Sequence, residues 1–224
     1  MLTLLTATGM RPEAWAICER LMMAQTYQGK ARWIIVDDGE KQQPITFERD
    51  GWTLEVIRPE PFWKLGENTQ ARNLMIGLAH IRPDDKLVIC EDDDLYLPGY
   101  LADVDKWLDR ADLVGEPMAR YFNVATGIGK QLTNKAHCSL CSTAVKGAGI
   151  KALCQAVLKN KKFIDMELWR TFKGTKYISN TRHVVGIKGL PGRDGIGCGH
   201  RMQGNPNKGM LRQWIGGSSE IYGY

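Results

Sequence analysis

The sequence contains no apolar run that approaches the roughly 18 residues of a membrane-spanning helix, and its mean hydropathy is −0.31. It has no Gly-X-Y repeat and no dense cysteine framework, which argues against a fibrous or disulfide-stapled protein. The six cysteines are scattered, and we expect reduced thiols rather than disulfides. With 43% hydrophobic and 25% charged residues, the 224-residue chain is expected to form one globular domain.

Several familiar sequence signals are also missing. The amino-terminal segment lacks the basic and long apolar regions of a signal peptide, and residues 2–6 instead predict a buried first strand. We therefore expect a cytoplasmic protein without membrane association. No Walker-type phosphate loop occurs, and no Gly-x-Gly-x-x-Gly fingerprint follows the first strand, which argues against a P-loop or a dinucleotide site.

Charge is divided unevenly between the two halves of the chain. Residues 1–112 contain 20 of the 25 acidic and 13 of the 30 basic side chains, whereas residues 113–224 contain 5 acidic and 17 basic ones. The first half thus has a net charge of −7 and the second of +12. An acidic half suits a metal-bridged ligand and a basic half suits a polyanion. The alternative is that both are solvated faces that happen to segregate.

The first half alternates short apolar runs with helical patterns, which is typical of a parallel sheet flanked by helices. Strands are predicted at 2–6, 33–36, 53–57 and 86–90, and helices are predicted to begin near Pro12, near Asn68 or Thr69, and at Pro98. Two carboxylates follow the second strand, and four follow the fourth. Because ligands of open α/β sheets bind at the carboxyl ends of the strands, both acidic clusters are expected at the functional edge.

The four consecutive carboxylates, Glu91 to Asp94, repel one another unless a cation or a solvated turn relieves them. Carboxylates without paired thiolates favour Mg²⁺ or Mn²⁺, and these ions commonly also hold substrate phosphates. The alternative is an acidic surface turn. The second acidic pair, Asp37 and Asp38 at the end of another predicted strand, argues against a surface turn.

The second half has a looser pattern. A strand is predicted near 121–124 and a helix near 150–158, while the stretch up to Lys146 is unassigned. Residues 186–199 contain six glycines and one proline, which predicts a mobile loop rather than a regular element. Cys138 and Cys141 form a single Cys-x-x-Cys, which is weak evidence for zinc without a second pair.

Five motifs occur in a consistent order over roughly residues 2–110, with a sixth segment, Asp165–Trp169, further along the chain. The five are Leu4–Glu13, Ala24–Tyr27, Ile34–Gly39, Ala71–Asn73 and Glu91–Leu101. Together they resemble the family 2 glycosyltransferases of the GT-A fold. The resemblance implies an α/β, Rossmann-like, mainly parallel sheet flanked by helices, with a smaller basic region on the acceptor side.

The resemblance also implies sugar transfer with inversion from a nucleotide-sugar donor, with a UDP-sugar as the first candidate. Residues 1–112 would form the nucleotide-sugar-binding half of one continuous domain. Residues 113–224, with the Gly-rich loop 186–199, would form the acceptor-binding half. The residues implied at the donor are Thr6, Thr8, Arg11, Asp37, Asp38, Arg72 and Asp92.

A divalent cation, Mn²⁺ or Mg²⁺, is implied at the acidic run. When the family's Asp-x-Asp-Asp pattern is aligned before Leu-x-Leu-Pro, its first position falls on Glu91, its metal-binding position on Asp93 and its last on Asp94. The glutamate departs from the family pattern, so Asp93 is the principal expected ligand. His200 is expected as an extra ligand from a carboxyl-terminal loop, with His183 as the alternative.

Asp165 is implied as the general base that accepts the proton of the acceptor hydroxyl, with Glu167 as the fallback. The alternative for Asp165 is a helix N-cap. Lys188, Arg193 and Arg201, in or beside the Gly-rich stretch, are expected either to clamp phosphates or to be solvated.

The second half, with its net charge of +12, would lie where acceptors bind, and this charge suggests a DNA acceptor. It also includes aromatic residues that could stack on bases, such as Trp169, Tyr177 and Trp214. Compact virus-encoded relatives attach sugars to hydroxymethylated bases. A 5-hydroxymethylated pyrimidine in DNA is therefore the expected acceptor, and a bacteriophage protein would act in the host cytoplasm. The alternatives are a saccharide or protein acceptor, a nucleotidyltransferase, and a non-catalytic nucleic-acid-binding module.

Overall fold

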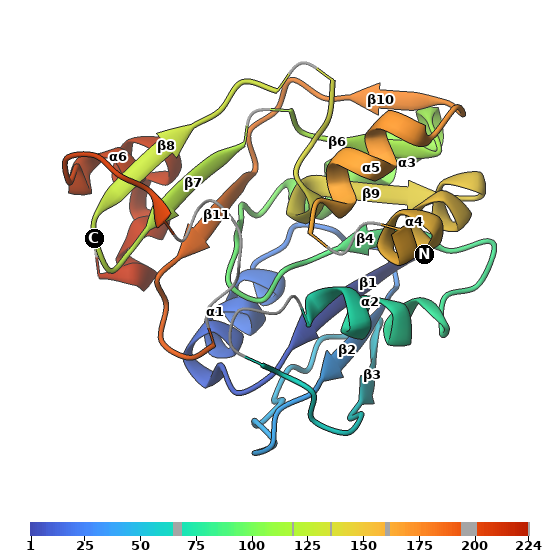
Figure 1. The fold of residues 1–224 in the computed structure, drawn as a ribbon, viewed down its shortest axis with the longest axis horizontal. Coiled ribbons are helices and arrows are strands. Elements are labelled where there is room, and N and C mark those ends of the chain that lie inside the picture. The colour runs from blue at the N-terminus through green and yellow to red at the C-terminus, as the bar shows by residue number, and fades with distance from the viewer. Residues whose placement is uncertain (65–68, 118, 135, 160–161, 194–200, 224) are drawn as a thin grey trace.

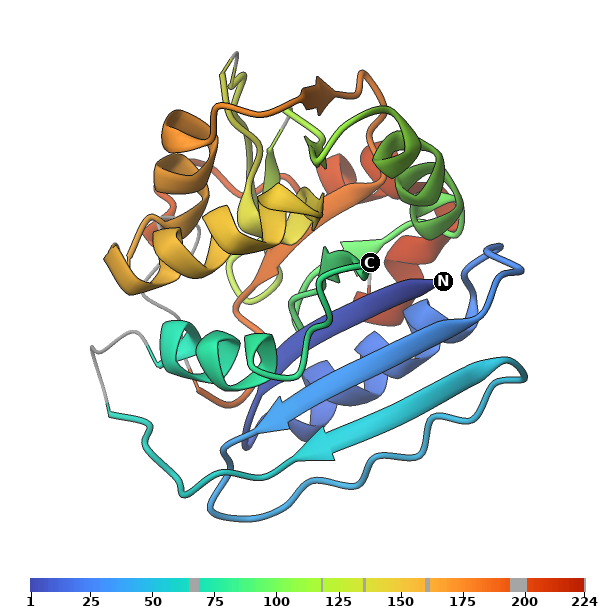
Figure 2. The same cartoon turned by 90° about the vertical axis from the view of Figure 1, so that its right-hand side faces the viewer.

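The computed structural model of the chain describes residues 1–64, 69–117, 119–134, 136–159, 162–193 and 201–223. A large central sheet has helices on both sides, and a second, smaller sheet lies beside it (Figures 1 and 2). This arrangement confirms the α/β fold class predicted from the alternating pattern.

The regular elements of the first half follow the predicted order. They are β1 (Leu2–Thr8), α1 (Pro12–Met23), β2 (Ala31–Asp37), β3 (Trp52–Ile57), α2 (Gln70–Leu78), β4 (Lys86–Ile89), β5 (Leu95–Tyr96) and α3 (Tyr100–Arg110). Pro12 occupies the first turn of α1, where its missing N–H costs no hydrogen bond. Thr69 is the N-cap residue of α2 but its side chain makes no capping hydrogen bond, and Asn68 lies outside the described residues.

The second half contributes shorter strands and three more helices. These elements are β6 (Leu113–Gly115), β7 (Arg120–Asn123), β8 (Ile128–Gln131), the 3₁₀ turn η1 (Leu140–Ser142), β9 (Thr143–Lys146), α4 (Ala148–Lys159), α5 (Ile164–Thr171), β10 (Lys176–Ile178), β11 (Val184–Lys188), α6 (Lys208–Ile215) and the 3₁₀ segment η3 (Gly216–Tyr222). The stretch left unassigned from sequence thus includes β8, η1 and β9. The carboxyl-terminal segment is ordered as α6 and η3.

The central sheet has seven strands in the order β10-β6-β9-β4-β1-β2-β3. All neighbouring pairs are parallel except those of β9, which is antiparallel to both β4 and β6. Because β6, β9 and β10 come from the second half, both halves of the chain share this sheet. The carboxyl ends of β1, β2 and β4 therefore meet at one edge.

Helices cover both faces of the sheet. The core on one face contains side chains of α1 and α3, and the core on the other contains those of α2, α4 and α5. Successive residues of the central strands point to opposite faces of the sheet and pack alternately into the two cores. Leu4 packs into the first core and Leu5 into the second. Strands buried on both faces must be apolar throughout, which explains why β1, β2 and β4 appear in the sequence as continuous apolar runs.

The smaller sheet has the order β5-β11-β7-β8 and packs on α6. Its strand β5 comes directly after the acidic run, and β11 pairs antiparallel with it through Val184 and Val185. Buried Glu116, just after β6, fixes the start of β11 by accepting hydrogen bonds from the backbone N–H groups of His183 (2.8 Å) and Val184 (3.0 Å). These pairings bring the end of β11 to the acidic run.

The prediction that residues 186–199 form one mobile loop is wrong for its first part. Gly186, Ile187 and Lys188 belong to β11, pair with β7 and are buried. Glycine is needed in this strand for packing, because a Cβ at Gly186 would lie 2.5 Å from the ring of Tyr121. The glycine content that suggested a loop therefore reflects a close approach between strands. Residues 194–199 lie outside the described residues.

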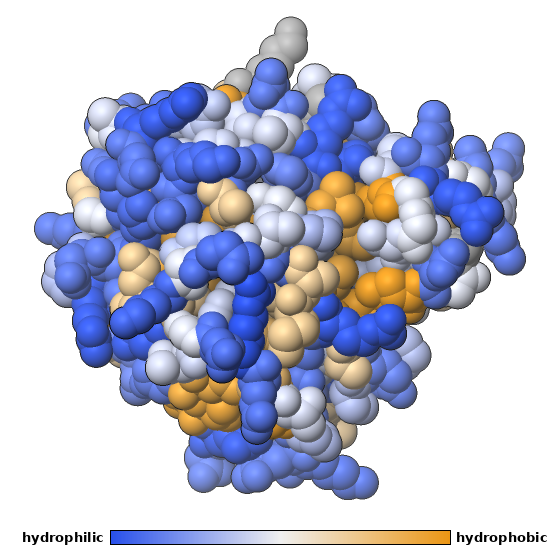
Figure 3. All heavy atoms as spheres, turned by 180° about the vertical axis from the view of Figure 1, so that it is seen from behind, coloured by the Kyte–Doolittle hydropathy of each residue, from blue (hydrophilic) through white to orange (hydrophobic). Residues whose placement is uncertain are grey.

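No helix in the described parts of the chain is both long and apolar enough to cross a membrane. Seen from behind, the surface is mostly hydrophilic, with apolar patches separated by polar side chains (Figure 3). Five cysteines of the described chain are free thiols: Cys18, Cys90, Cys138, Cys141 and Cys154.

Candidate functional site

A cavity of about 700 Å³ opens at the carboxyl edge of the central sheet. Its walls come from the ends of β1 and β4, from the amino-terminal part of α2, from the segment before η1, from the start of α5 and from the end of β11. Both halves of the chain thus build it. The sequence-predicted residues that line it are Thr8, Arg11, Asp38, Glu91, Asp92, Asp93, Asp94, Asp165, Lys188, Arg193 and Arg201.

Three predicted donor-binding residues do not line this cavity. The hydroxyl of Thr6 is buried and accepts a hydrogen bond from Trp33 Nε1 (2.9 Å). Asp37 accepts one from the backbone N–H of Gly39 (3.1 Å) and faces Arg58 (3.6 Å), so it supports the turn after β2. Arg72 donates to the carbonyl of Glu60 and stacks over Phe62. In this structure these three side chains contact neighbouring residues and do not line the cavity.

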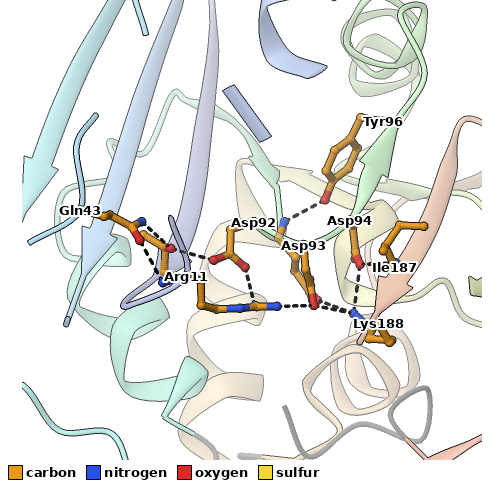
Figure 4. Close-up of polar contacts among 10 residues, drawn as sticks. Arg11, Gln43, Asp92, Asp93, Asp94, Tyr96, Ile187 and Lys188 are labelled. Carbon is orange, nitrogen blue, oxygen red and sulfur yellow. Dashed lines mark hydrogen bonds and ion pairs between the residues drawn. The ribbon is translucent and has the colours of Figure 1, made fainter. Parts of the chain in front are cut away.

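The acidic run lies at the centre of a polar network that joins four segments of the chain (Figure 4). Asp92 accepts hydrogen bonds from Thr8 Oγ1 and from Arg11, both at 2.7 Å. The other terminal nitrogen of Arg11 donates to Asp93 at 3.1 Å. Gln43 closes this side, because its Nε2 donates to Thr8 Oγ1 while its Oε1 accepts from the backbone N–H of Arg11.

Lys188 faces the other side of the run (Figure 4). Its Nζ donates to Asp94 Oδ1 (3.0 Å) and to Asp93 Oδ2 (3.2 Å), and lies 3.9 Å from Glu91 Oε2. Asp94 Oδ1 also accepts from the backbone N–H of Ile187 (3.0 Å). The acidic run is therefore not a solvated surface turn: Asp92, Asp93 and Asp94 are all buried.

The two cations do not fully balance the four carboxylates, and the pKa values reflect this. Burial, with the charge of Asp94 beside it, raises the pKa of Glu91 to about 8. Burial also raises the pKa of Asp94 to about 6, with Asp93 adding to the effect and Lys188 opposing it. Burial opposes the ionisation of Asp93 as well, yet Lys188 and Arg11 hold its pKa below its usual range.

The carboxylates fit a hard divalent cation. Ligand oxygens of Glu91, Asp93 and Asp94 all lie within 4.8 Å of one another, the one such group of metal-ligating side chains in the described chain. Asp94 Oδ2 is buried and accepts no hydrogen bond from an N–H or O–H group, while the weakly donating Cys141 thiol lies beside the Asp94 carboxylate. When all four carboxyls are ionised, the formal charge that Arg11 and Lys188 leave uncompensated is −2, which one Mg²⁺ or Mn²⁺ would balance. The three residues are those at which the sequence motif places the metal, with Asp93 as the principal expected ligand.

Of the two predicted histidine ligands, the structure describes only His183. His200 lies outside the described residues. His183 does not line the cavity, because its Nε2 faces Asp103 Oδ2 (3.0 Å) and its ring lies beside Tyr100 and Trp107. Cys138 and Cys141 are buried and belong to no metal-ligating group among the described residues.

Asp38 occupies a second polar corner of the cavity. Arg193 donates to Asp38 Oδ1 (2.6 Å) and to its backbone carbonyl (3.2 Å), and its guanidinium lies 5.4 Å from the centre of the Trp63 ring. Asp38 Oδ2 is buried and has no hydrogen-bond partner. The segment after β1 approaches this carboxylate closely, since a Cβ at Gly9 would lie 2.4 Å from Asp38 Oδ1. This corner therefore contains one buried acceptor oxygen without a partner, next to an arginine that stacks on Trp63.

The two candidate bases are separated by the structure. α5 begins at Ile164 with Phe163 as its N-cap, so Asp165 lies in the first turn rather than at the cap. Asp165 lines the cavity, and burial raises its pKa while His137 opposes the rise. Glu167, two residues further along and so on another side of the helix, is not in the cavity wall and forms ion pairs with Lys159 (2.7 Å) and Arg170 (2.5 Å).

Several wall residues had no role assigned from sequence. Trp63, Asn73 and His137 line the cavity, and Gln43 supports it from behind Thr8. Asn73 lies in a recognised motif, Ala71–Asn73, but received no role there, and no acidic or glycine-rich motif marked Trp63, Gln43 or His137. Their proximity to the acidic run arises only when the strands and α2 pack.

The fold and the cavity define an α/β protein of the GT-A type with an acidic run at the carboxyl edge of its sheet. Solved structures of S. aureus TarS share this fold. The TarS structure has a TM-score of 0.59 and 11% identity over 84% of this chain. TarS 1-349 in complex with UDP gives 0.58 and 12% over 84%, and its complex with UDP-GlcNAc gives 0.57 and 13% over 87%.

The present chain spans 37% of the TarS chain and 60% of each TarS 1-349 chain. No protein-family model matches the sequence, and no curated protein matches it either. At these identities the likeness establishes the fold. The GT-A fold expected from the sequence motifs is thereby confirmed.

The raised pKa of Glu91 leads to a pH-dependent stability in the absence of divalent cations. A carboxyl whose folded pKa of about 8 exceeds its usual 4.5 stabilises the fold while protonated. This contribution is present below about pH 4.5 and is lost as the pH rises through about 8. In EDTA, Glu91→Gln should therefore gain free energy of unfolding relative to wild type as the pH is raised from about 5 to about 8.

Urea denaturation at several pH values measures the difference, and Glu48→Gln, at an exposed position, is the control. A difference between Glu91→Gln and wild type that stays constant over this range contradicts the prediction.

Proposed function

We propose that this protein transfers a sugar from a UDP-sugar to an acceptor hydroxyl. The observation that carries the proposal is the joint placement of Asp38, the acidic run and Asp165 on one cavity of a GT-A fold. UDP is the first nucleotide to test because structures with this fold hold UDP and UDP-GlcNAc.

The donor would lie between the Asp38 corner and the acidic run. The free Oδ2 of Asp38 would accept a hydrogen bond from the base or ribose, and Trp63 offers a ring on which the base can stack. Thr8 and Arg11 would keep Asp92 and Asp93 in place beneath the diphosphate. Thr6, Asp37 and Arg72 would act by supporting this wall.

Glu91, Asp93 and Asp94 would hold Mn²⁺ or Mg²⁺, with Asp93 as the principal ligand. When bound, the ion would neutralise charge on the diphosphate leaving group. His200 remains a proposed additional ligand.

Asp165 would act as the general base. The acceptor O–H proton passes to its carboxylate, the acceptor oxygen bonds to the anomeric carbon, and the bond from that carbon to the diphosphate breaks, which releases the nucleoside diphosphate. A direct displacement of this kind inverts the anomeric centre. Its raised pKa makes Asp165 a stronger base than an exposed aspartate.

Binding of UDP in the presence of Mn²⁺ tests the donor site, with Asp38→Asn as the variant. Loss of the carboxylate acceptor should weaken UDP binding by about tenfold. Asp50→Asn is the control, because this aspartate is exposed and does not line the cavity. Calorimetric titration measures both. If no nucleoside diphosphate binds to the wild type, the proposed function is wrong.

Turnover tests the assignment of the base. Asp165→Asn should lower kcat by about a hundredfold or more and leave UDP affinity unchanged, because a general base acts only on the acceptor. Glu167→Gln, on the same helix but outside the cavity wall, should retain kcat within about threefold. A loss of turnover confined to Glu167→Gln would reverse the assignment. Release of UDP rather than pyrophosphate distinguishes transfer of a sugar from transfer of a nucleotide.

For the acceptor we propose a 5-hydroxymethylated pyrimidine in DNA. The net charge of +12 in residues 113–224 supports a polyanion. Cations from this half, including Lys130, Lys162 and Arg201, also line the cavity on which Asp165 lies. Residues 113–224 would then act as the acceptor half, and a virus-encoded enzyme would work in the host cytoplasm.

Salt dependence and acceptor choice test this assignment. Affinity for duplex DNA should fall steeply with rising salt, and Lys130→Met should reduce the slope of log K against log salt by about one if it contacts a phosphate. Labelled sugar should be transferred to duplexes with hydroxymethylcytosine and not to the unmodified duplex. Transfer to oligosaccharides or proteins alone would instead identify one of those acceptors.

A further inference from the structure

Lys188 is a buried lysine whose side chain points into the proposed metal site. It is 7% exposed, and its Nζ lies within 3.9 Å of all three carboxylates of that site. The nearest contacts are 3.0 Å to Asp94 and 3.2 Å to Asp93. An ammonium group thus already provides the three carboxylates with a positive charge.

The backbone of Lys188 is held firmly. Its carbonyl accepts a hydrogen bond from the backbone N–H of Val124 (2.8 Å), and it pairs with Asn123 of β7. The next residue, Gly189, has a φ of +79° and lies so close to Asn123 that a Cβ would meet its Oδ1 at 2.4 Å. The strand therefore presents the ammonium from a fixed point, and only the flexible side chain can withdraw it.

A divalent ion and this ammonium require the same oxygens. Mg²⁺ binds carboxylate oxygens at about 2.0–2.1 Å, and Ca²⁺ at about 2.3–2.6 Å, with lone pairs directed at the ion. Asp93 Oδ2 already accepts from both Lys188 and Arg11, and Asp94 Oδ1 accepts from both Lys188 and Ile187. Two cations a few ångströms apart in a buried site also repel each other strongly.

We propose that Lys188 competes with the divalent cation for Glu91, Asp93 and Asp94, so that metal binding requires its ammonium to leave these carboxylates. The inference rests on the proposed function only for the identity of the metal site. The withdrawn ammonium stays at the cavity wall, where the donor diphosphate offers it a new anionic partner. Metal and donor would then bind together more readily than the metal alone.

Mn²⁺ binding without nucleotide tests the competition directly. Titrations followed by electron paramagnetic resonance of free Mn²⁺ should show weak binding to wild type and about tenfold or more tighter binding to Lys188→Met. Lys188→Arg, which retains a cation, should stay close to wild type. Lys130→Met removes the same charge from the same cavity without removing a partner of the three carboxylates, and it should also bind Mn²⁺ like wild type.

Thermal unfolding provides a second measurement if the Lys188→Met protein is too unstable to be purified in EDTA. Its unbalanced carboxylates should then be stabilised by the ion, so the variant should be recovered in Mn²⁺ and its Tm should rise more on Mn²⁺ addition than that of wild type.

Wild-type protein gives a second test that needs no substitution. Amine acylation followed by mass spectrometry should find Lys188 protected in EDTA and more reactive at saturating Mn²⁺.

Equal Mn²⁺ affinity of wild type and Lys188→Met overturns the proposal, as does weaker affinity of the variant. Absence of binding to both also overturns it, because Lys188 would then not be what keeps the metal out. Unchanged protection of Lys188 at saturating Mn²⁺ has the same consequence. None of these measurements uses UDP, so a failure of the proposed transferase activity would appear separately, in the UDP titration.

Discussion

The concentration of four carboxylates at the end of β4 is the constraint on which the cavity depends. Buried carboxylates cannot remain ionised beside one another without counter-charges, and the local sequence provides none. Arg11 comes from the turn after β1, and Lys188 comes from the end of β11. Two distant parts of the chain therefore meet at the acidic run. The ion pairs that offset the repulsion among the carboxylates also connect the two sheets at this point.

This constraint also explains how the smaller sheet contributes to the cavity. β5 follows the acidic run directly, β11 pairs with β5, and Glu116 anchors the start of β11. These pairings place the ammonium of Lys188 beside the acidic run, where the proposed divalent ion would also bind. With all four carboxyls ionised, the formal charge left for a ligand to balance is about −2. The cavity thus brings carboxylates and cations together at one edge of the sheet, and the function proposed for it rests on this arrangement.

Much of the site could be predicted from the sequence, because its carboxylates follow apolar strands whose ends must meet. Asp38 and the acidic run were placed correctly on this argument. Thr6, Asp37 and Arg72 illustrate its limit: each lies in a predicted motif, yet its side chain contacts local partners and does not line the cavity. The sequence did not predict that Gly186 to Lys188 belong to a strand. Gly186 is required by the close approach of the Tyr121 ring, whereas its presence in the sequence suggested a loop.

The sequence by itself determined the α/β class, the order of the first four long strands and the edge where the acidic groups gather, since these follow from local periodicity and from the direction of parallel strands. Only the tertiary structure decided that Asp165 rather than Glu167 lines the cavity, and that Lys188 faces the three carboxylates. Both depend on the packing of segments separated by some seventy to a hundred residues, and no local pattern encodes which side chains such packing brings within hydrogen-bond distance.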